Sequence, residues 1–216
     1  MNAFTRWMSL LFAVCLLGVS GTRALARRDP PADVARLLPD EGCPAPCWAG
    51  LRPGQLSGET LQAWLTEPPT GWHAERANPP MAVPGVIEYW KIAPPAGAPF
   101  VLGTVRVHEP GADALHLLPA DLTLGEAVAA LGAPDYVLFG LGPDRPAGPT
   151  LQYQAVFRGG YLAVTGLIPA GASHLAVSAP VEALVYRAVP AERSVLAHDW
   201  RGFGPMVRYY PQGAVP

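Results

Sequence analysis

The sequence predicts an α+β protein built from two similar halves, each a short helix packed on an antiparallel sheet. Amphipathic segments with helix-capping signals occur twice, at residues 57–65 and 122–135. Each is followed by several short segments rich in β-branched and aromatic residues, which are typical of strands. Half of the 216 residues are hydrophobic, against 26 prolines and 23 glycines. We therefore expect a folded core with its prolines in loops and strand edges.

Residues 1–26 have the pattern of a cleaved secretory signal peptide. A positive Arg6 precedes an apolar run over residues 7–19, and a small-x-small cleavage site follows at residues 24–26. The apolar run is shorter than the roughly 20 residues that a membrane-spanning helix needs. An uncleaved signal that anchors the domain to the membrane is the alternative. Either way, the sequence predicts a secreted or cell-envelope protein.

The predicted mature chain, residues 27–216, carries a mild negative charge. Removing Arg6 and Arg23 from the 15 basic side chains leaves 13, against 17 acidic ones, for a formal charge near −4. Such a balance gives no electrostatic reason to expect binding to nucleic acid or to an anionic membrane. We expect no nucleic-acid partner, and a membrane contact only if the signal stays uncleaved.

The mature chain is predicted to begin with a polar, flexible lead over residues 27–42, which holds a short helix at 32–38. The exported α+β domain then covers residues 43–216, with halves at about 43–118 and 119–216. In the first half, Ser57 begins a short helix that places Leu61, Trp64 and Leu65 on one face and ends at Pro68-Pro69. The strands predicted after this helix cover residues 86–92, 100–108 and 113–118.

The second half repeats this order with a clearer helix signal. Thr123 and Glu126 form a capping-box pair, and Gly132 ends the helix. Overlaying the segment 125–128 on 58–61 gives an offset of 67 residues, which indicates an internal duplication. The strands predicted after this helix cover residues 136–139, 151–158, 161–167 and 181–189.

Cys43 and Cys47 are the candidate site residues, and a structural disulfide is the first interpretation of the pair. In an exported protein, two cysteines four positions apart with two prolines between them most simply close a small bridge. A redox-active pair usually has two intervening residues at a helix N-terminus, and here there are three. Metal binding by the pair is the remaining alternative, although no further ligand follows at zinc-like spacing.

No other motif in the chain predicts a catalytic, metal or cofactor site. The glycine-rich segment 140–148 contains two prolines, which remove backbone donors that a phosphate cradle needs, so we interpret it as a hairpin loop. The histidines lack the short spacings typical of metal ligands; they are His73, His108, His116, His174 and His198. We therefore predict no catalytic residues, no metal and no cofactor. Tryptophans and tyrosines are expected mostly in the core, and those left exposed on a sheet would mark a binding face.

Three motifs carry a resemblance to known proteins. They are Cys43-x-x-x-Cys47-Trp48-x-Gly50-Leu51-x-Pro53-Gly54, the later Leu124-Gly125-Glu126 to Leu131-Gly132-x-Pro134-Asp135, and the terminal Trp200-x-Gly202-Phe203. Together they resemble a group of exported bacterial proteins of uncharacterised function. The helix starts and the Leu-Gly-x-Pro-Asp segment also resemble small lipoproteins of the outer-membrane barrel-assembly machinery and the β-lactamase-inhibitor proteins. That resemblance implies helices packed on an antiparallel sheet and a function in binding other proteins. The chain departs from the lipoprotein pattern because no lipidated cysteine follows the signal.

These observations favour a non-catalytic module that binds a protein partner in the cell envelope or outside the cell. The alternative function is a small envelope hydrolase or a thiol-disulfide oxidoreductase. Exchange of Cys43 and Cys47 with a dithiol at a mild potential would distinguish the thiol enzyme from a structural bridge.

Overall fold

The computed structural model describes residue 7 and residues 32–39, 42–67, 71–78, 85–94, 99–105 and 113–210. The chain divides into two compact units, residues 1–30 and 31–216, and Trp7 is the described residue of the first. The predicted signal peptide apart from Trp7, the helix end at Pro68-Pro69 and His108 lie outside the described residues. Within these ranges, no helix is long and apolar enough to cross a membrane.

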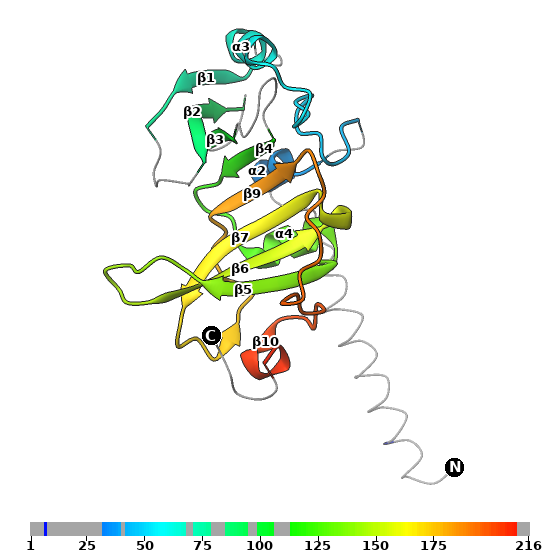
Figure 1. Cartoon of the computed structure of the whole chain (residues 1–216), viewed down its shortest axis with the longest axis vertical. Coiled ribbons are helices and arrows are strands. Elements are labelled where there is room, and N and C mark those ends of the chain that lie inside the picture. Colours follow the sequence, from blue (N-terminus) through cyan, green and yellow to red (C-terminus); the bar gives the residue numbers. More distant parts are fainter. Residues whose placement is uncertain are drawn as a thin grey trace. The chain divides into compact units, whose positions relative to one another are not determined.

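The second unit is an α+β structure with one antiparallel sheet of eight strands (Figure 1). The strand order is β1-β2-β3-β4-β9-β7-β6-β5, and a separate pair joins β8 to β10. The strands are β1 His73–Arg76, β2 Val86–Ala93, β3 Phe100–Val105, β4 Ala114–Leu118, β5 Tyr136–Leu141, β6 Thr150–Phe157, β7 Leu162–Pro169, β8 His174–Leu175, β9 Ala183–Arg187 and β10 Gly204–Pro205. The helices are α2 Ala32–Leu37, α3 Gly58–Thr66 and α4 Leu124–Leu131, with short 3-10 turns at Arg158–Gly160 and Met206–Arg208.

The seven longer strands predicted from the sequence are all present, with ends shifted by a few residues. The predicted strand at 181–189 is shorter in the structure, where β9 covers Ala183–Arg187. Of the predicted loop 140–148, Gly140 and Leu141 extend β5, and residues 142–148 lie in the connection between β5 and β6, where Arg145 pairs with Gly148. The strands β1, β8 and β10 were not predicted. They have two to four residues each, too few for an alternating pattern to stand out.

The two predicted helices of the domain begin and pack as the sequence indicates. In α3, the Ser57 side chain accepts a hydrogen bond from the Thr60 backbone, and Leu61 and Leu65 are buried. In α4, Thr123 and Glu126 form the capping box, with the Thr123 backbone donating to the Glu126 carboxylate at 2.9 Å. Gly132 follows with a positive φ of 86°, a conformation that glycine adopts at little cost.

The ordered packing starts before Cys43, within the segment predicted as a flexible lead. Helix α2 confirms the short helix expected at 32–38, and Leu37 and Leu38 are buried in the main core. The Tyr186 hydroxyl donates to the Leu37 carbonyl at 2.7 Å, and the Trp48 indole donates to the Arg36 carbonyl at 3.0 Å. These contacts fix the last turn of α2 to the sheet, because buried polar atoms of Tyr and Trp need partners.

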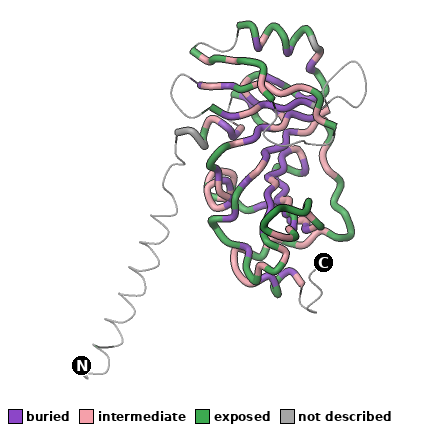
Figure 2. The backbone as a smooth tube through the Cα atoms, turned by 90° about the vertical axis from the view of Figure 1, so that its left-hand side faces the viewer, coloured by how far each residue is buried: buried purple, intermediate pink, exposed green. Residues whose placement is uncertain are grey.

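The main core fills the space between the helices and one face of the sheet. Figure 2 shows buried residues along the strands, whereas much of α3 is exposed. Tyr153 lies in this core, and its hydroxyl donates to the Pro180 carbonyl at 2.7 Å. A Cβ atom on Gly166 would collide with both groups, so the Tyr153 ring fits only because residue 166 has no side chain.

Candidate binding surface

The alternation of side chains along β4 and β9 separates two faces of the sheet. Leu115 and Leu117 of β4, with Leu184 and Tyr186 of β9, belong to the main core on the helix side. We call this side the covered face. Because successive side chains of a strand point to opposite sides, the residues between them lie on the other side. We call that side the open face; Figure 1 shows it toward the viewer, with α2 and α4 behind the sheet.

The open face has a small apolar centre with polar and aromatic neighbours. The strand register and alternation place one row of residues across it: Tyr89, Gly103, His116, Val185, Ala163, Val156 and Tyr136. A second cluster of buried residues forms this centre and includes Ala163, Val185 and Tyr136. Because Gly103 has no side chain, the Val86 side chain packs directly against it; a Cβ at residue 103 would lie 2.9 Å from the Val86 side chain. The face therefore combines small residues in its floor with larger ones around them.

A segment that we call the strap, residues 188–199, borders the open face at the ends of β5, β6 and β7. It crosses in front of these strand ends in Figure 1. The Tyr136 hydroxyl donates to the Ala191 carbonyl at 3.0 Å, and Val137 and His198 exchange backbone hydrogen bonds of 2.9 and 2.8 Å. Val195 and Leu196 of the strap are 99% and 68% exposed, so the border of the open face is apolar.

Two hollows lie along the open face. The larger has a volume of about 440 Å³ and lies between Val101, Leu118 and Val181, with Lys91 and Glu182 among its lining residues. The smaller, of about 200 Å³, lies over β5 and β6 beside Gln152 and Gln154. Both are shallow and mostly apolar, as a surface that receives another protein's side chains is.

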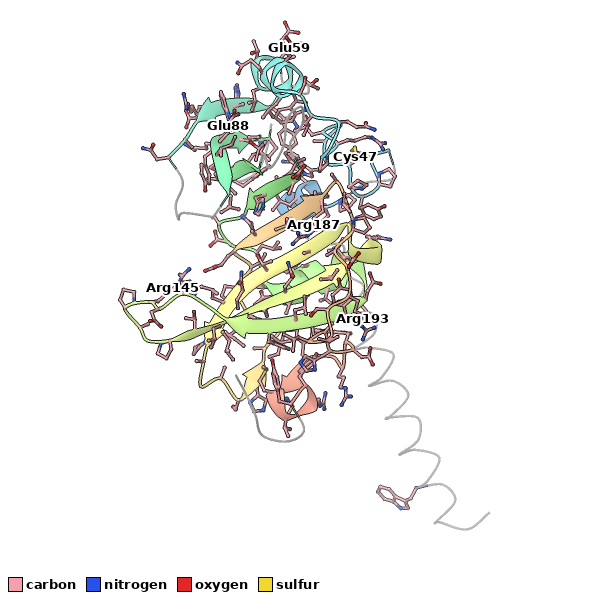
Figure 3. The ribbon with its side chains drawn as sticks, viewed as in Figure 1. Cys47, Glu59, Glu88, Arg145, Arg187 and Arg193 are labelled. Atoms are coloured by element: carbon pink, nitrogen blue, oxygen red, sulfur yellow. A yellow bond between two sulfur atoms is a disulfide. The ribbon has the colours of Figure 1, made fainter. Side chains whose placement is uncertain are left out.

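The charged side chains at the larger hollow are held by ion pairs. Arg145, on the β5–β6 hairpin, contacts Glu182 with an N to O distance of 2.5 Å (Figure 3). Burial raises the pKa of Glu182, and the charge and hydrogen bond of Arg145 oppose this rise. Lys91 pairs with Glu75 of β1 at 3.0 Å. The Arg145–Glu182 pair thus connects the β5–β6 hairpin to the segment that precedes β9.

At the middle of the sheet, His116 and Arg187 lie on neighbouring strands of the open face. Burial lowers the pKa of His116 to about 4, and the positive charge of Arg187 adds to the lowering. Burial also lowers the pKa of Arg187, while it raises that of Tyr136. His116 is therefore neutral at pH 7, where its ring carries one N–H donor and one acceptor nitrogen.

Cys43 and Cys47, the predicted bridge, lie at disulfide distance, with their Cα atoms 5.1 Å apart. The pair is buried next to an aromatic cluster of Trp48, Trp64 and Trp72 with ring centroids 5.7 to 6.1 Å apart. The Gly50 backbone donates to the Cys43 sulfur at 3.2 Å. This environment packs the bridge against the core, consistent with a bracing role.

The described histidines lie on different elements of the fold. His73 lies on β1 and His174 on β8, while His198 belongs to the strap and packs against Tyr210 with ring centroids 4.9 Å apart. Among the described residues, no group of three His, Cys, Asp or Glu side chains could hold a metal ion. By strand register, His116 lies at the middle of the open face and His73 lies on the same face at its β1 edge.

Sequence reasoning missed the residues that define the open face. The predicted strands β4 and β9 contain Ala114, His116, Val185 and Arg187 at alternating positions, but both strands are apolar on their other side as well. A signal did exist: a histidine and an arginine each interrupt an otherwise apolar strand. Their pairing as neighbours could not be inferred without the strand order.

No protein-family model, no curated protein and no solved structure matches this chain.

Proposed function

We propose that this chain is an exported, non-catalytic module that binds a protein partner through the open face of its sheet. The proposal rests on the difference between the faces, since the helices and the main core fill one side, whereas on the other side half-buried and exposed side chains surround a small buried apolar centre. Tyrosine and arginine, which dominate interface hot spots, occur there as the half-buried Tyr89 and Arg187, whereas Tyr136 of the same face is buried. The exposed Val195 and Leu196 of the strap extend this surface with apolar area.

A protein partner fits this surface better than a small ligand does. The row of open-face residues crosses seven strands, whereas small-molecule sites are deep and enclose most of their ligand. The hollows of about 440 and 200 Å³ lie at separate places along the face. Several side chains of one partner could occupy them together.

We also propose that the domain consists of two similar halves, about 43–118 and 119–216, joined through β4 and β9. In support, α3 precedes β1-β2-β3-β4 and α4 precedes β5-β6-β7-β9, and each set of four strands pairs in chain order. The N-cap residues Ser57 and Thr123 are 66 positions apart, close to the offset of 67 seen in the sequence. The junction of the halves would then lie in the middle of the binding face.

Export is part of the proposal and rests on the N-terminal pattern and the cysteine pair at disulfide distance. We expect the mature protein to begin at Arg27 and to lie in the cell envelope or outside the cell. Mass spectrometry of the protein isolated from its source organism measures the N-terminus directly. If the isolated protein still begins at residue 1, the signal is not cleaved, and the interpretation as a membrane anchor replaces that of a cleaved signal.

The binding function is tested by capture followed by affinity measurement. Protein produced from the full chain is used to capture partners from the envelope and secreted fractions of the source organism. The affinity of a purified partner is then compared between the wild type, Gln154→Arg on the open face and Gln62→Arg on α3. We expect Gln154→Arg to weaken binding at least about tenfold, because a charge inserted into a packed interface is left unpaired.

Gln62→Arg is the matched control, since Gln62 is exposed on α3 and the substitution is chemically the same. Equal loss of affinity in both variants would place the interface elsewhere. Reproducible absence of any partner, together with turnover of an ester, peptide or thiol substrate, would overturn the binding proposal in favour of an enzyme.

A further inference from the structure

Arg187 lies on the open face without an acidic partner among the described residues, whereas three other cations on or beside this face are paired. Lys91 pairs with Glu75, Arg145 with Glu182, and Arg193 of the strap with Asp199 at 2.5 Å. Arg187 forms neither an ion pair nor a side-chain hydrogen bond with any residue in the ranges that the structure describes. Figure 3 shows it on β9, at the middle of the sheet.

The position of Arg187 makes this lack of a partner costly. The side chain lies opposite Ala114 in the register of β4 and β9, where the small methyl group leaves room for the arginine stem. Its Nε atom is buried without an acceptor, whereas the residue as a whole is half-buried. A buried N–H without an acceptor destabilises the folded state, and a charged one does so more strongly. Binding of an anion to the guanidinium would therefore recover part of the lost free energy.

None of the described groups around Arg187 provides it with a negatively charged partner, so an anion from outside the chain could take that place. His116 is neutral, and the Tyr136 hydroxyl already donates to the Ala191 carbonyl. The negative charge of Asp135 raises the pKa of Tyr136. The Asp135 carboxylate accepts a hydrogen bond from the Gly159 backbone at 2.8 Å. Arg193 lies over the Tyr136 ring at 5.6 Å and adds positive potential beside it. Partial burial strengthens the attraction for an anion, because the local dielectric constant is below that of water.

We propose that Arg187 is the docking point for a carboxylate of the protein partner, so that an aspartate or glutamate of the partner reaches the open face where β4 meets β9. This inference rests on the proposed binding function and names the chemistry of its centre. The guanidinium presents a planar pair of donors that matches a carboxylate in two hydrogen bonds. One uncompensated cation fits a single negative charge, whereas a polyanion such as nucleic acid needs several. The wide sheet around it accommodates the rest of a protein surface.

The first test measures carboxylate binding without the partner. Arginine side-chain N–H signals of the full chain are followed by NMR during titration with N-acetyl-glutamate N-methylamide. We expect the Arg187 Nε–H signal to shift in a saturable way, with an affinity in the millimolar range typical of a lone ion pair in water. The uncharged N-acetyl-glutamine N-methylamide is the control and should leave the signal in place. An Arg187 signal that does not respond to the acid overturns the inference, whether or not a partner is known.

The second test uses the captured partner and three variants of this chain. Arg187→Gln should weaken binding about 10- to 100-fold, and Arg187→Lys should recover part of the loss because it restores the charge without the paired donors. Arg52→Gln is the charge-matched control, since Arg52 is exposed beside the Cys43–Cys47 bridge and away from the strands. Near-ultraviolet circular dichroism checks that each variant keeps its tertiary packing.

The outcomes separate this inference from the proposed function. A partner that binds Arg187→Gln as tightly as the wild type overturns the carboxylate anchor and leaves the binding function standing. Reproducible absence of a partner together with turnover of a substrate overturns the proposed function, and the NMR titration then decides the carboxylate anchor alone. A response to the small acid in the absence of any protein partner would assign Arg187 to a small carboxylate ligand. It would overturn the proposal that the carboxylate belongs to a protein.

Discussion

The two faces of the eight-stranded sheet are built from the same strands and differ in almost every property. The covered face carries leucines, aromatic rings and the contacts of the helices; the Tyr153 and Tyr186 hydroxyls have internal partners there, whereas the Thr104 hydroxyl is buried without a partner among the described residues. The open face has alanines and valines in its floor, with His116, Arg187 and Gln154 standing among them. One side is organised for stability. The other contains a histidine and an arginine whose burial costs free energy. Their presence is not explained by stability alone.

This difference gives a rule for locating function in such a domain. Substitutions on the covered face should change the free energy of unfolding, because they alter a packed core. Substitutions of half-exposed residues on the open face should change binding while leaving the free energy of unfolding nearly unchanged, whereas the buried cluster at its centre and the buried His116 should also affect stability.

Trp48 provides the strongest test of the covered face. It is 1% exposed and packs against Trp64, Trp72 and Phe100, and Trp48→Ala would leave a large cavity among them. We expect a loss of about 3–5 kcal/mol in the free energy of unfolding, measured by urea denaturation with tryptophan fluorescence and circular dichroism.

The matched open-face control is Gln154→Ala, which should change the free energy of unfolding by less than about 0.5 kcal/mol. If both substitutions cost the same, the open face is part of the core and the comparison between faces fails. A small loss for Trp48→Ala would instead mean that the aromatic cluster does not support the domain.

The pH dependence of stability tests the perturbed part of the open face. The pKa of His116 is lowered to about 4, below its ordinary value of 6.5, mainly by burial and then by Arg187. As the pH falls, the unfolded chain therefore binds the proton first. The contribution of His116 to stability is complete above about pH 6.5 and is lost between pH 6.5 and 4, by at most about 3 kcal/mol.

Urea unfolding at several pH values measures this loss, and His116→Gln should remove most of it. The control is His73→Gln on β1, where the histidine is exposed and the pH dependence should persist. An unchanged slope in His116→Gln would show that other groups cause the acid sensitivity.

Local signals in the sequence account for most of the covered face. Ser57 and Thr123 begin helices, Gly132 ends one, and the β-branched and aromatic segments become the seven longer strands of the sheet. These features depend on neighbours in the chain, so they can be inferred without knowledge of the fold. The burial of Leu37 and Leu38 could not, because it depends on contacts of α2 with Trp48 and Tyr186.

The open face was beyond prediction for the same physical reason. His116 and Arg187 are 71 positions apart and become neighbours only because β4 pairs with β9 rather than with β5. The apolar alternation of both strands shows that each has a buried side, but not which side the helices occupy. Strand order, and with it the site, depends on long-range pairing that the sequence pattern leaves open.

The helix caps test how firmly the covering helices are held. Thr123→Ala removes the hydroxyl that accepts from the Glu126 backbone and contacts its carboxylate at 2.7 Å. We expect a loss of about 1 kcal/mol in the free energy of unfolding. Ser57→Ala, at the exposed cap of α3, should cost about 0.5 kcal/mol, at the lower end of the range for such caps.

Thermal or urea unfolding of the two cap variants measures this difference. Leu124 and Ala127 of α4 are fully buried, so loosening the start of this helix also disturbs the main core. A larger loss at Ser57 than at Thr123 would show that α3, rather than α4, is the helix that stabilises the covered face.

The ion pair of Lys91 and Glu75 is the smallest test and probes the open face where no burial complicates it. Both side chains are at least half exposed, and their atoms lie 3.0 Å apart. Water and salt screen such a pair, so Lys91→Gln should change the free energy of unfolding by less than about 0.5 kcal/mol, and less still at high salt. Urea denaturation at two salt concentrations measures both values. A loss above about 1 kcal/mol would mean that this edge of the open face carries stability, and the separation of roles between the faces would then hold only at the middle of the sheet.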